Sequence, residues 1–272
     1  MTWIWILLAP LLGGLLYGGE RVLRARMQRR QGPPLLQPFY DMFKLLDKRT
    51  LIVHAPHALL AVAHFFVLWF TVAAIFLGWN LLYIIFLHLF AQMLLILAGY
   101  SVRSPYSHLG ANRELLMLIA YEPVLILVAV GFYLLSGSFE ITEIMRGGNY
   151  LFQMPLLFAA LLMIVPIKVK KSPFDVGEAH QEIVGGVEIE YSGVFYEFLY
   201  MSRFLEYLFI YSFVFIFGGV SCWLGSVLAA GVFLLVNLVD NATARVRTAQ
   251  MVKIIYAMAM SLAVVNLLWM LV

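Results

Sequence analysis

The sequence has few charged residues and a single cysteine. Only 12% of its 272 residues are Asp, Glu, Lys or Arg, about half the share that is usual in soluble domains. This scarcity excludes an ordinary soluble domain. Cys222 alone cannot form an intrachain disulfide, and an iron–sulfur cluster needs about four thiolate ligands. Whatever redox chemistry this protein serves, its own chain cannot carry such a cluster.

The sequence is instead rich in long apolar runs. Hydrophobic residues make up 63% of the chain, and they gather in runs of about 20 residues, the length that spans a bilayer as a helix. The first run lacks the flanks of a signal peptide, so we interpret it as a retained span. The sequence predicts an all-α membrane protein with eight transmembrane helices and a single polytopic domain over residues 1–272. The expected spans are Trp3–Gly18, Pro56–Gly78, Trp79–Tyr100, Leu115–Leu135, Leu151–Val169, Phe204–Gly219, Trp223–Val239 and Val252–Leu271.

Positive charge lies almost entirely on one side of these spans. Every Lys and Arg except Arg146 falls in or beside alternate connections, and basic residues mark the cytoplasmic side of a membrane protein. We therefore expect cytoplasmic loops at about 20–55, 101–114, 170–203 and 240–251, with both termini on the outer side. The net charge of +3 follows from this topology and indicates no nucleic-acid partner.

The first cytoplasmic loop combines prolines with an amphipathic segment. The prolines stop the first helix, and Phe39, Phe43 and Leu46 then recur at helical spacing. This pattern predicts a short helix in the membrane interface. It is either a simple surface helix or part of a docking surface for a soluble partner, which we favour. The expected docking residues of the first two cytoplasmic loops are Arg29, Arg30, Pro33, Pro34, Gln37, Pro38, Asp41, Lys44, Arg103 and Arg113.

Acidic residues gather in the loop at 170–203. The first three carboxylates are spaced i, i+3 and i+7, so a helix ending at Gly185-Gly186 would place them on one face. Neighbouring carboxylates raise one another's proton affinity, and such a group can take up and release protons or gather cations. A solvated acidic loop is the alternative, but it would not need the apolar residues between the acids. The candidate residues are Asp175, Glu178, His180, Glu182, Glu188, Glu190 and Glu197.

Two further carboxylates belong to the fourth span. Glu114 stands at its start and Glu122 lies about two turns further in. A carboxylate that faces lipid costs on the order of 2.5–3.5 kcal/mol on insertion scales. Glu122 should therefore face protein or water, either in a structural hydrogen bond to a neighbouring helix or in a proton relay, and we favour the relay.

The acidic loop resembles a known family. Its start, Pro173-Phe174-Asp175, and its end, Glu190-Tyr191-Ser192, are similar to the loop between spans five and six of the NADH dehydrogenase subunit one family, the H subunits of complex I. The likeness extends to Gly32-Pro33, to Leu36-Gln37-Pro38 and to Tyr121-Glu122. It therefore covers most of the chain, and it implies a membrane anchor beneath a soluble redox module.

The residues before Pro173 differ from those of quinone-reducing members. Those members carry an alanine-glutamate-threonine-asparagine-arginine run, whereas this chain has Lys168-Val169-Lys170-Lys171-Ser172. His180 also stands where they have another glutamate. The segments His180-Gln181-Glu182-Ile183-Val184 and Arg103-Ser104-Pro105-Tyr106 are more similar to membrane-bound energy-converting [NiFe] hydrogenases of group 4, the Ech type.

This second resemblance implies a non-catalytic subunit of a complex in the cell membrane that oxidises ferredoxin and evolves hydrogen. Iron–sulfur clusters and a nickel–iron centre would lie on other subunits, and this chain would hold no metal. The expected partners are the hydrogenase large and small subunits, an iron–sulfur subunit and an antiporter-like membrane subunit. Glu114, Glu122 and the loop carboxylates would pass protons or sodium ions toward the antiporter-like subunit, and Asp240 and Arg245 would help to set the electric field.

Three other functions stay open. A quinone-site subunit of a complex I-like oxidoreductase would explain the same family resemblance. A stand-alone ion transporter would explain the intramembrane acids, although no inverted repeat is apparent. A membrane cytochrome could hold haem between histidines such as His57, His64 and His88. No histidine pair at facing depths is evident, however, and we expect these three side chains to be hydrogen-bonded between helices or near the interface.

Overall fold

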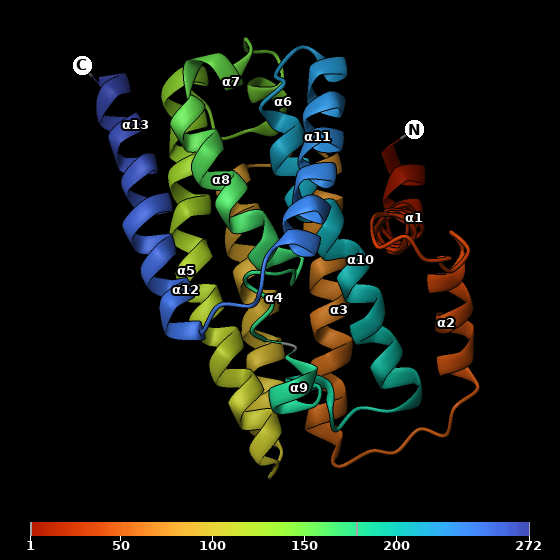
Figure 1. The fold of residues 1–272 in the computed structure, drawn as a ribbon. Coiled ribbons are helices and arrows are strands. Elements are labelled where there is room, and N and C mark those ends of the chain that lie inside the picture. Colours follow the sequence, from red (N-terminus) through yellow and green to blue (C-terminus); the bar gives the residue numbers. More distant parts are fainter. Residues whose placement is uncertain (1, 178, 272) are drawn as a thin grey trace.

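The computed structural model describes residues 2–177 and 179–271. They form an all-α bundle, which confirms the fold class (Figure 1). Seven segments are long and apolar enough to cross a membrane. They are α1 (Thr2–Met27), α3 (Ala55–Phe76), α4 (Leu81–Ser101), α5 (Pro105–Ser136), α10 (Gly193–Ile216), α11 (Cys222–Ala242) and a last segment made of α12 (Thr248–Ile254), the π-helical η2 (Ile255–Met260) and α13 (Ser261–Leu271).

The fifth expected span is helical but short. It forms α8 (Pro155–Lys168), which has 14 residues. At 1.5 Å per residue such a helix is about 21 Å long, and the apolar core of a bilayer is about 30 Å thick. The sequence therefore predicted the position of this helix correctly and overestimated its reach. Its last residue, Lys168, is buried, so the chain leaves α8 inside the bundle.

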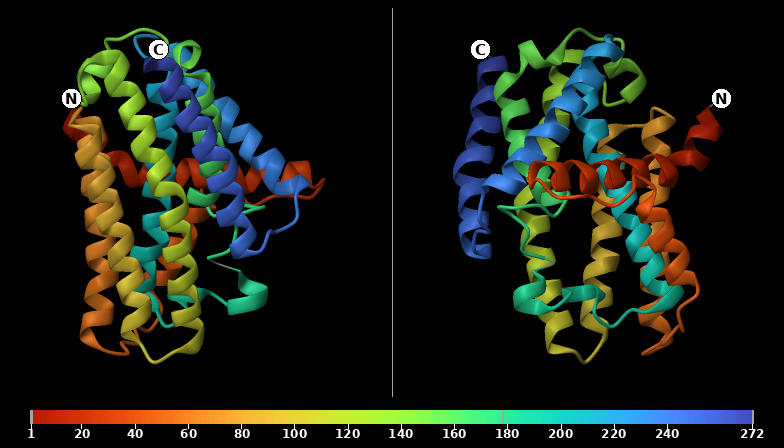
Figure 2. Two further views of the ribbon diagram at one scale, coloured as in Figure 1. Left: turned by 90° about the vertical axis from the view of Figure 1, so that its left-hand side faces the viewer. Right: turned by 45° about the vertical axis from the view of Figure 1, so that its right-hand side comes forward.

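The first helix continues beyond its expected end. Helix α1 extends to Met27, so Glu20 lies on a helix rather than in a loop. Figure 2 shows α1 crossing the other long helices instead of running alongside them. Gly13 makes this crossing possible, because a Cβ there would collide with the backbone carbonyl of Phe204 on α10.

The short helix predicted after the prolines is present as α2 (Gln37–Leu46). Its three expected apolar residues do not share one environment. Phe39 packs toward Phe204, with 6.2 Å between ring centroids, whereas Phe43 and Leu46 are exposed. The short elements α6 (Ile141–Ile144) and α7 (Tyr150–Gln153) lie in the connection between α5 and α8.

The helix expected over the first three loop carboxylates is wrong. Only α9 (His180–Ile183) and the 3-10 turn η1 (Gly186–Glu188) are helical there. Glu178 lies outside the described residues, and Asp175 has no helical neighbours. The segment instead packs closely on α5, where a Cβ on Gly110 would stand 2.6 Å from the Cα of Gly186. Contacts with several other elements therefore determine the backbone conformation of this loop, which is largely not helical.

Candidate functional site

The end of α8 places an ammonium group among buried acceptors. Lys168 Nζ lies 2.7 Å from Glu206 Oε2, 2.7 Å from His88 Nε2 and 3.3 Å from the Tyr121 hydroxyl. These partners come from α10, α4 and α5, respectively. A buried charge is tolerated only when it is paired and hydrogen-bonded. Glu206 supplies the countercharge for Lys168, and Gln92 donates a hydrogen bond to the other carboxylate oxygen of Glu206.

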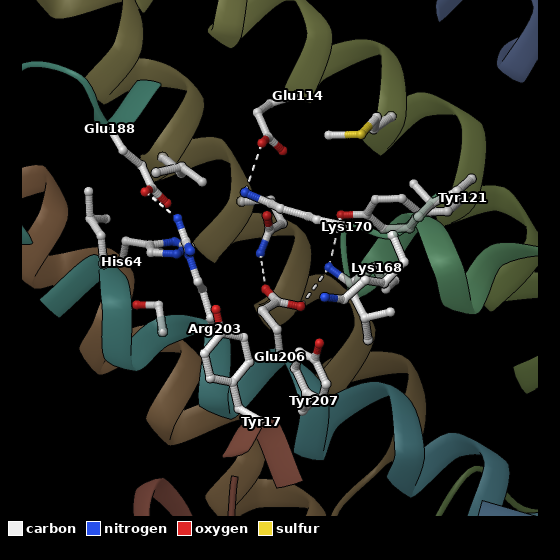
Figure 3. Close-up of a pocket in the computed structure, with 18 residues that line it drawn as sticks. Tyr17, His64, Glu114, Tyr121, Lys168, Lys170, Glu188, Arg203, Glu206 and Tyr207 are labelled. Carbon is white, nitrogen blue, oxygen red and sulfur yellow. Dashed lines mark hydrogen bonds and ion pairs between the residues drawn. The ribbon is translucent and has the colours of Figure 1, made fainter. Parts of the chain in front are cut away.

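A cavity of about 80 Å³ adjoins this group. Figure 3 shows Lys168, Lys170, Arg203, Glu114 and Glu206 converging on it. One water molecule needs about 10–15 Å³ of such a volume, so the cavity has room for several. Pockets that hold organic ligands are larger, at about 300–1,000 Å³. The cavity therefore suits water and ions.

Three lysines, one at the end of α8 and two just after it, pair with carboxylates of three different helices. Lys168 pairs with Glu206 on α10, and Lys170 Nζ lies 2.9 Å from Glu114 Oε1 on α5. Lys171 pairs with Glu20 on α1, and Glu20 also accepts a hydrogen bond from Tyr207. The lysines diverge because the helix has ended and Lys170 adopts a positive φ of 52°. Movement of this one backbone segment would thus disturb three ion pairs together.

Three of the described loop carboxylates pair with bases. Asp175 lies 2.7 Å from Arg245, Glu182 lies 2.7 Å from Arg113, and Glu188 pairs with Arg203. These bases come from α5, α10 and the connection after α11.

Asp240 links the loop to the first helix. It accepts hydrogen bonds from Arg24 of α1 and from the backbone N–H of Ser172, with N···O distances of 2.8 and 3.1 Å. The Asp240 side chain is 4% exposed. Together with Arg245, this residue joins the end of α11 to the segment that follows α8.

The last part of the loop is fastened to the start of α3. The Tyr191 ring stacks on His57 with 3.8 Å between centroids, and its hydroxyl donates to the His57 carbonyl at 2.8 Å. Ser192 Oγ accepts from the N–H of Leu51 at 2.8 Å. Burial raises the pKa of Tyr191, so the phenol keeps its proton and can donate. Glu190, half-buried, precedes this anchor, and buried Glu197 follows it on α10.

Glu122 faces protein, as expected. It is 4% exposed on α5, and its Oε2 lies 3.9 Å from His88 Nδ1. Neither oxygen of Glu122 has a hydrogen-bond partner among the described residues, and the same holds for His88 Nδ1. Three buried polar atoms therefore meet across a gap too wide for a direct hydrogen bond.

The histidines are hydrogen-bonded between helices, which confirms that expectation for two of them. His64 Nδ1 on α3 lies 2.7 Å from the Ala91 carbonyl on α4. His88 on α4 contacts Lys168 and Glu206. These contacts account for both side chains without a haem group. Among the described residues, no cluster of His, Cys, Asp or Glu has the arrangement of a metal site.

The expected docking residues divide into two sets. Arg29, Arg30, Lys44 and Arg103 are exposed. Others serve the chain's own packing: Pro38 is buried, and Arg21 Nη1 lies 2.7 Å from Asp41 Oδ2. Gln37 also donates to Asp41. Burial would raise the pKa of Asp41, but the hydrogen bonds from Arg21 and Gln37 outweigh it and hold that pKa below its usual value.

The sequence reasoning missed several residues of the site. An ionisable residue inside an apolar span is by default a candidate functional residue, and this signal marks Glu206 and His88. Glu20 was assigned to a loop, because the first helix was expected to end at Gly18. Lys168 was noticed only as a departure from the quinone-reducing pattern. The omitted residues of the buried network are Glu20, His88, Lys168, Lys170, Lys171, Arg203, Glu206 and Tyr207.

Comparisons with known proteins agree with this architecture. The NADH dehydrogenase family model matches residues 1–271. The H subunit of NADH-quinone oxidoreductase from Bacillus thuringiensis (strain Al Hakam) is 31% identical over 227 residues, which cover 74% of this chain and 68% of the relative. The same protein of Bacillus cereus (strain B4264) gives the same values.

A solved structure shares the fold. It is a chain of the membrane-bound sulfane sulfur reductase, an archaeal respiratory membrane complex, with a TM-score of 0.86 and 23% identity, covering 99% of this chain and 98% of that one. The family match over nearly the full length, the relatives among NADH-quinone oxidoreductase subunits and the apolar helices lead to one conclusion. The chain belongs to the NADH dehydrogenase family and is a multi-pass cell-membrane subunit, of the H type, of a complex I-like respiratory complex.

Proposed function

We propose that this chain is the membrane subunit of an energy-converting [NiFe] hydrogenase complex. It anchors a soluble module that oxidises ferredoxin and evolves hydrogen, and it couples that reaction to the movement of protons or sodium ions. The observation that carries the proposal is the run of three lysines around the cavity. They lie in the segment where quinone-reducing members carry the alanine-glutamate-threonine-asparagine-arginine run. Each lysine pairs with a carboxylate of another helix.

The size of the cavity supports this choice. At about 80 Å³ it accommodates water molecules along the ion pairs, and it is smaller than the pockets that hold organic ligands. With one cysteine, this chain cannot hold an iron–sulfur cluster. The clusters and the nickel–iron centre therefore belong to other subunits, where they supply the electron transfer and proton reduction.

The chain's own residues provide a route for coupling. Exposed Arg29, Arg30, Lys44 and Arg103 are the proposed contacts to the soluble subunits. A shift there moves the loop, whose pairs Asp175–Arg245 and Glu182–Arg113 tie it to neighbouring elements. The lysine segment lies directly before these pairs, so it moves as well.

Movement of the lysines changes the balance of charge around the cavity. When Lys170 and Lys171 withdraw, Glu114 and Glu20 lose the cations that pair with them. When the segment returns, the ion pairs form again. Passage of charge to an antiporter-like subunit, through Glu114, Glu122 and the loop carboxylates, completes the proposed coupling.

A second candidate function is a quinone-site subunit. The relatives at 31% identity are NADH-quinone oxidoreductase subunits, which favours this reading of the same fold. It requires the cavity to widen around a quinone, and it predicts activity that quinone-site inhibitors block.

The test is the metal content and acceptor of the complex purified through this subunit in mild detergent. Nickel and iron together, with hydrogen evolution from reduced ferredoxin, would support the proposal. Iron without nickel would overturn it, and inhibitor-sensitive quinone reduction would then establish the second candidate. Iron without nickel but with reduction of sulfane sulfur would assign the chain to a complex like its structural neighbour. A well-folded subunit with neither metal would favour the stand-alone transporter.

A further inference from the structure

His88 lies between two carboxylates of different helices. It is fully buried on α4, and its ring stacks on Phe209 of α10 with 4.0 Å between centroids and 11° between planes. The Nε2 edge faces Lys168 and Glu206, and the Nδ1 edge faces Glu122. The stacking fixes the ring plane, so the two edges keep these separate partners.

The contact with Lys168 determines which nitrogen of His88 carries the proton. A lysine ammonium group can only donate hydrogen bonds. At 2.7 Å from Lys168 Nζ, Nε2 of His88 is therefore the acceptor, and a neutral ring must hold its proton on Nδ1. That proton points toward Glu122, across the 3.9 Å gap. A small movement of either side chain closes a gap of this size to hydrogen-bond distance.

Withdrawal of Lys168 reverses the arrangement. Glu206 Oε2, 3.3 Å from Nε2, is then the remaining partner on that edge. As a carboxylate it only accepts, so it favours a proton on Nε2. Nδ1 then becomes an acceptor that faces Glu122, and a protonated Glu122 satisfies it by donating. His64, Gln92 and Tyr121 also line this region, and each is a neutral neighbour.

We propose that His88 transmits the position of Lys168 to Glu122 and so makes Glu122 the binding site of one proton. The inference rests on the proposed ion-translocating function. With Lys168 in place, His88 holds its proton on Nδ1 and offers it to Glu122, which favours the ionised carboxylate. When Lys168 withdraws, one proton from bulk solvent reaches Nε2 by way of the cavity and Glu206, which lines it, and the Nδ1 proton passes to Glu122. The ring is neutral before and after, and the net change is one proton gained by Glu122.

The tautomer of His88 is directly measurable. The chain has six histidines, and the ¹⁵N NMR signal of His88 in labelled protein is the one absent from His88→Gln. We expect Nδ1 to carry the proton in the unmodified protein and in Lys168→Arg, because arginine also only donates. In Lys168→Met the proton should move to Nε2. An Nε2 proton in the unmodified protein, or an unchanged tautomer in Lys168→Met, would overturn the inference.

Ion uptake by the whole complex in proteoliposomes tests the functional part. His88→Gln and Glu122→Gln should each lower the protons taken up per electron transferred by at least tenfold, with the soluble module still bound. His108→Gln is the control, because His108 is exposed, contacts the Val102 carbonyl and lies outside this group. Wild-type uptake in both test variants would overturn the role of His88. A wild-type complex that moves no ions at all would instead overturn the proposed function.

Discussion

At the scale of single residues, the site is defined by ion pairs that lie inside the bundle. The side chains of Lys168 and Glu206 are 3% and 13% exposed. Breaking a buried pair by removing one partner costs more than removing both, because a lone buried charge remains. This asymmetry gives the pair a measurable signature.

We expect Lys168→Met and Glu206→Gln each to destabilise the protein by about 3–5 kcal/mol. The double variant should lose no more than the worse single variant, because no charge is then left unpaired. Heat-induced unfolding of the purified protein in detergent measures all three. Arg146→Gln is the control, since the Arg146–Glu143 pair is exposed and should contribute less than about 1 kcal/mol. Additive losses in the double variant would contradict the pairing.

At the scale of elements, the loop after α8 depends on its close approach to α5. Gly110 leaves room for the backbone of Gly186 and Val187, each 2.6 Å from the place of a Cβ. Backbone atoms cannot avoid a new methyl group by changing rotamer, as a flexible side chain can. An added methyl group must therefore push the loop off the helix.

Gly110→Ala should destabilise the protein by about 1–3 kcal/mol through overpacking, and it should expose the loop to protease. Gly231→Ala on α11 is the matched control, because no atom lies within 4 Å of the place of its Cβ. There the alanine should be neutral, or stabilising by up to about 1 kcal/mol. Thermal unfolding combined with limited proteolysis distinguishes the two variants, and equal behaviour would be evidence against the close approach.

The attachment of α2 to α1 should depend on pH. The pKa of Asp41 is lowered in the folded protein, so the ionised carboxylate stabilises the fold above its ordinary pKa, near 4. That stabilisation is lost as the pH falls through the lowered value. Asp41→Asn should therefore unfold at a lower temperature than the unmodified protein at pH 7, and the difference should vanish at acidic pH. A difference independent of pH would show that Asp41 acts without its charge.

The sequence predicted most elements because apolar length alone signals a membrane helix. It predicted α2 from helical spacing, and it marked Glu122 and Glu114 as carboxylates on a span. It failed where contacts between segments far apart in the sequence determine the structure. Glu20 and Tyr207 are 187 positions apart, and no local pattern connects them. The helix expected near Asp175 was wrong because contacts to α5 and Arg245 compete with local spacing.

At the scale of the whole molecule, the polar network is enclosed by helices whose outer surfaces are apolar. Exposed side chains such as Phe66, Phe86, Leu238 and Trp269 suit lipid or membrane partners. Both marked chain ends lie toward the same end of the bundle (Figure 1). Which end faces the cytoplasm stays a prediction from the positive charges.

The short α8 has a consequence for the voltage across the membrane. Helix α8 is about 9 Å shorter than the apolar core of a bilayer is thick, and ion pairs and a cavity lie where it ends. The potential falls mainly across material of low dielectric constant, so it is focused on the thinner remainder beside Lys168. One elementary charge crossing the full potential changes in energy by about 2.3 kcal/mol per 100 mV. Under the proposed coupling, the membrane voltage would act on the lysine segment, and an energised membrane would oppose the redox reaction of the soluble module.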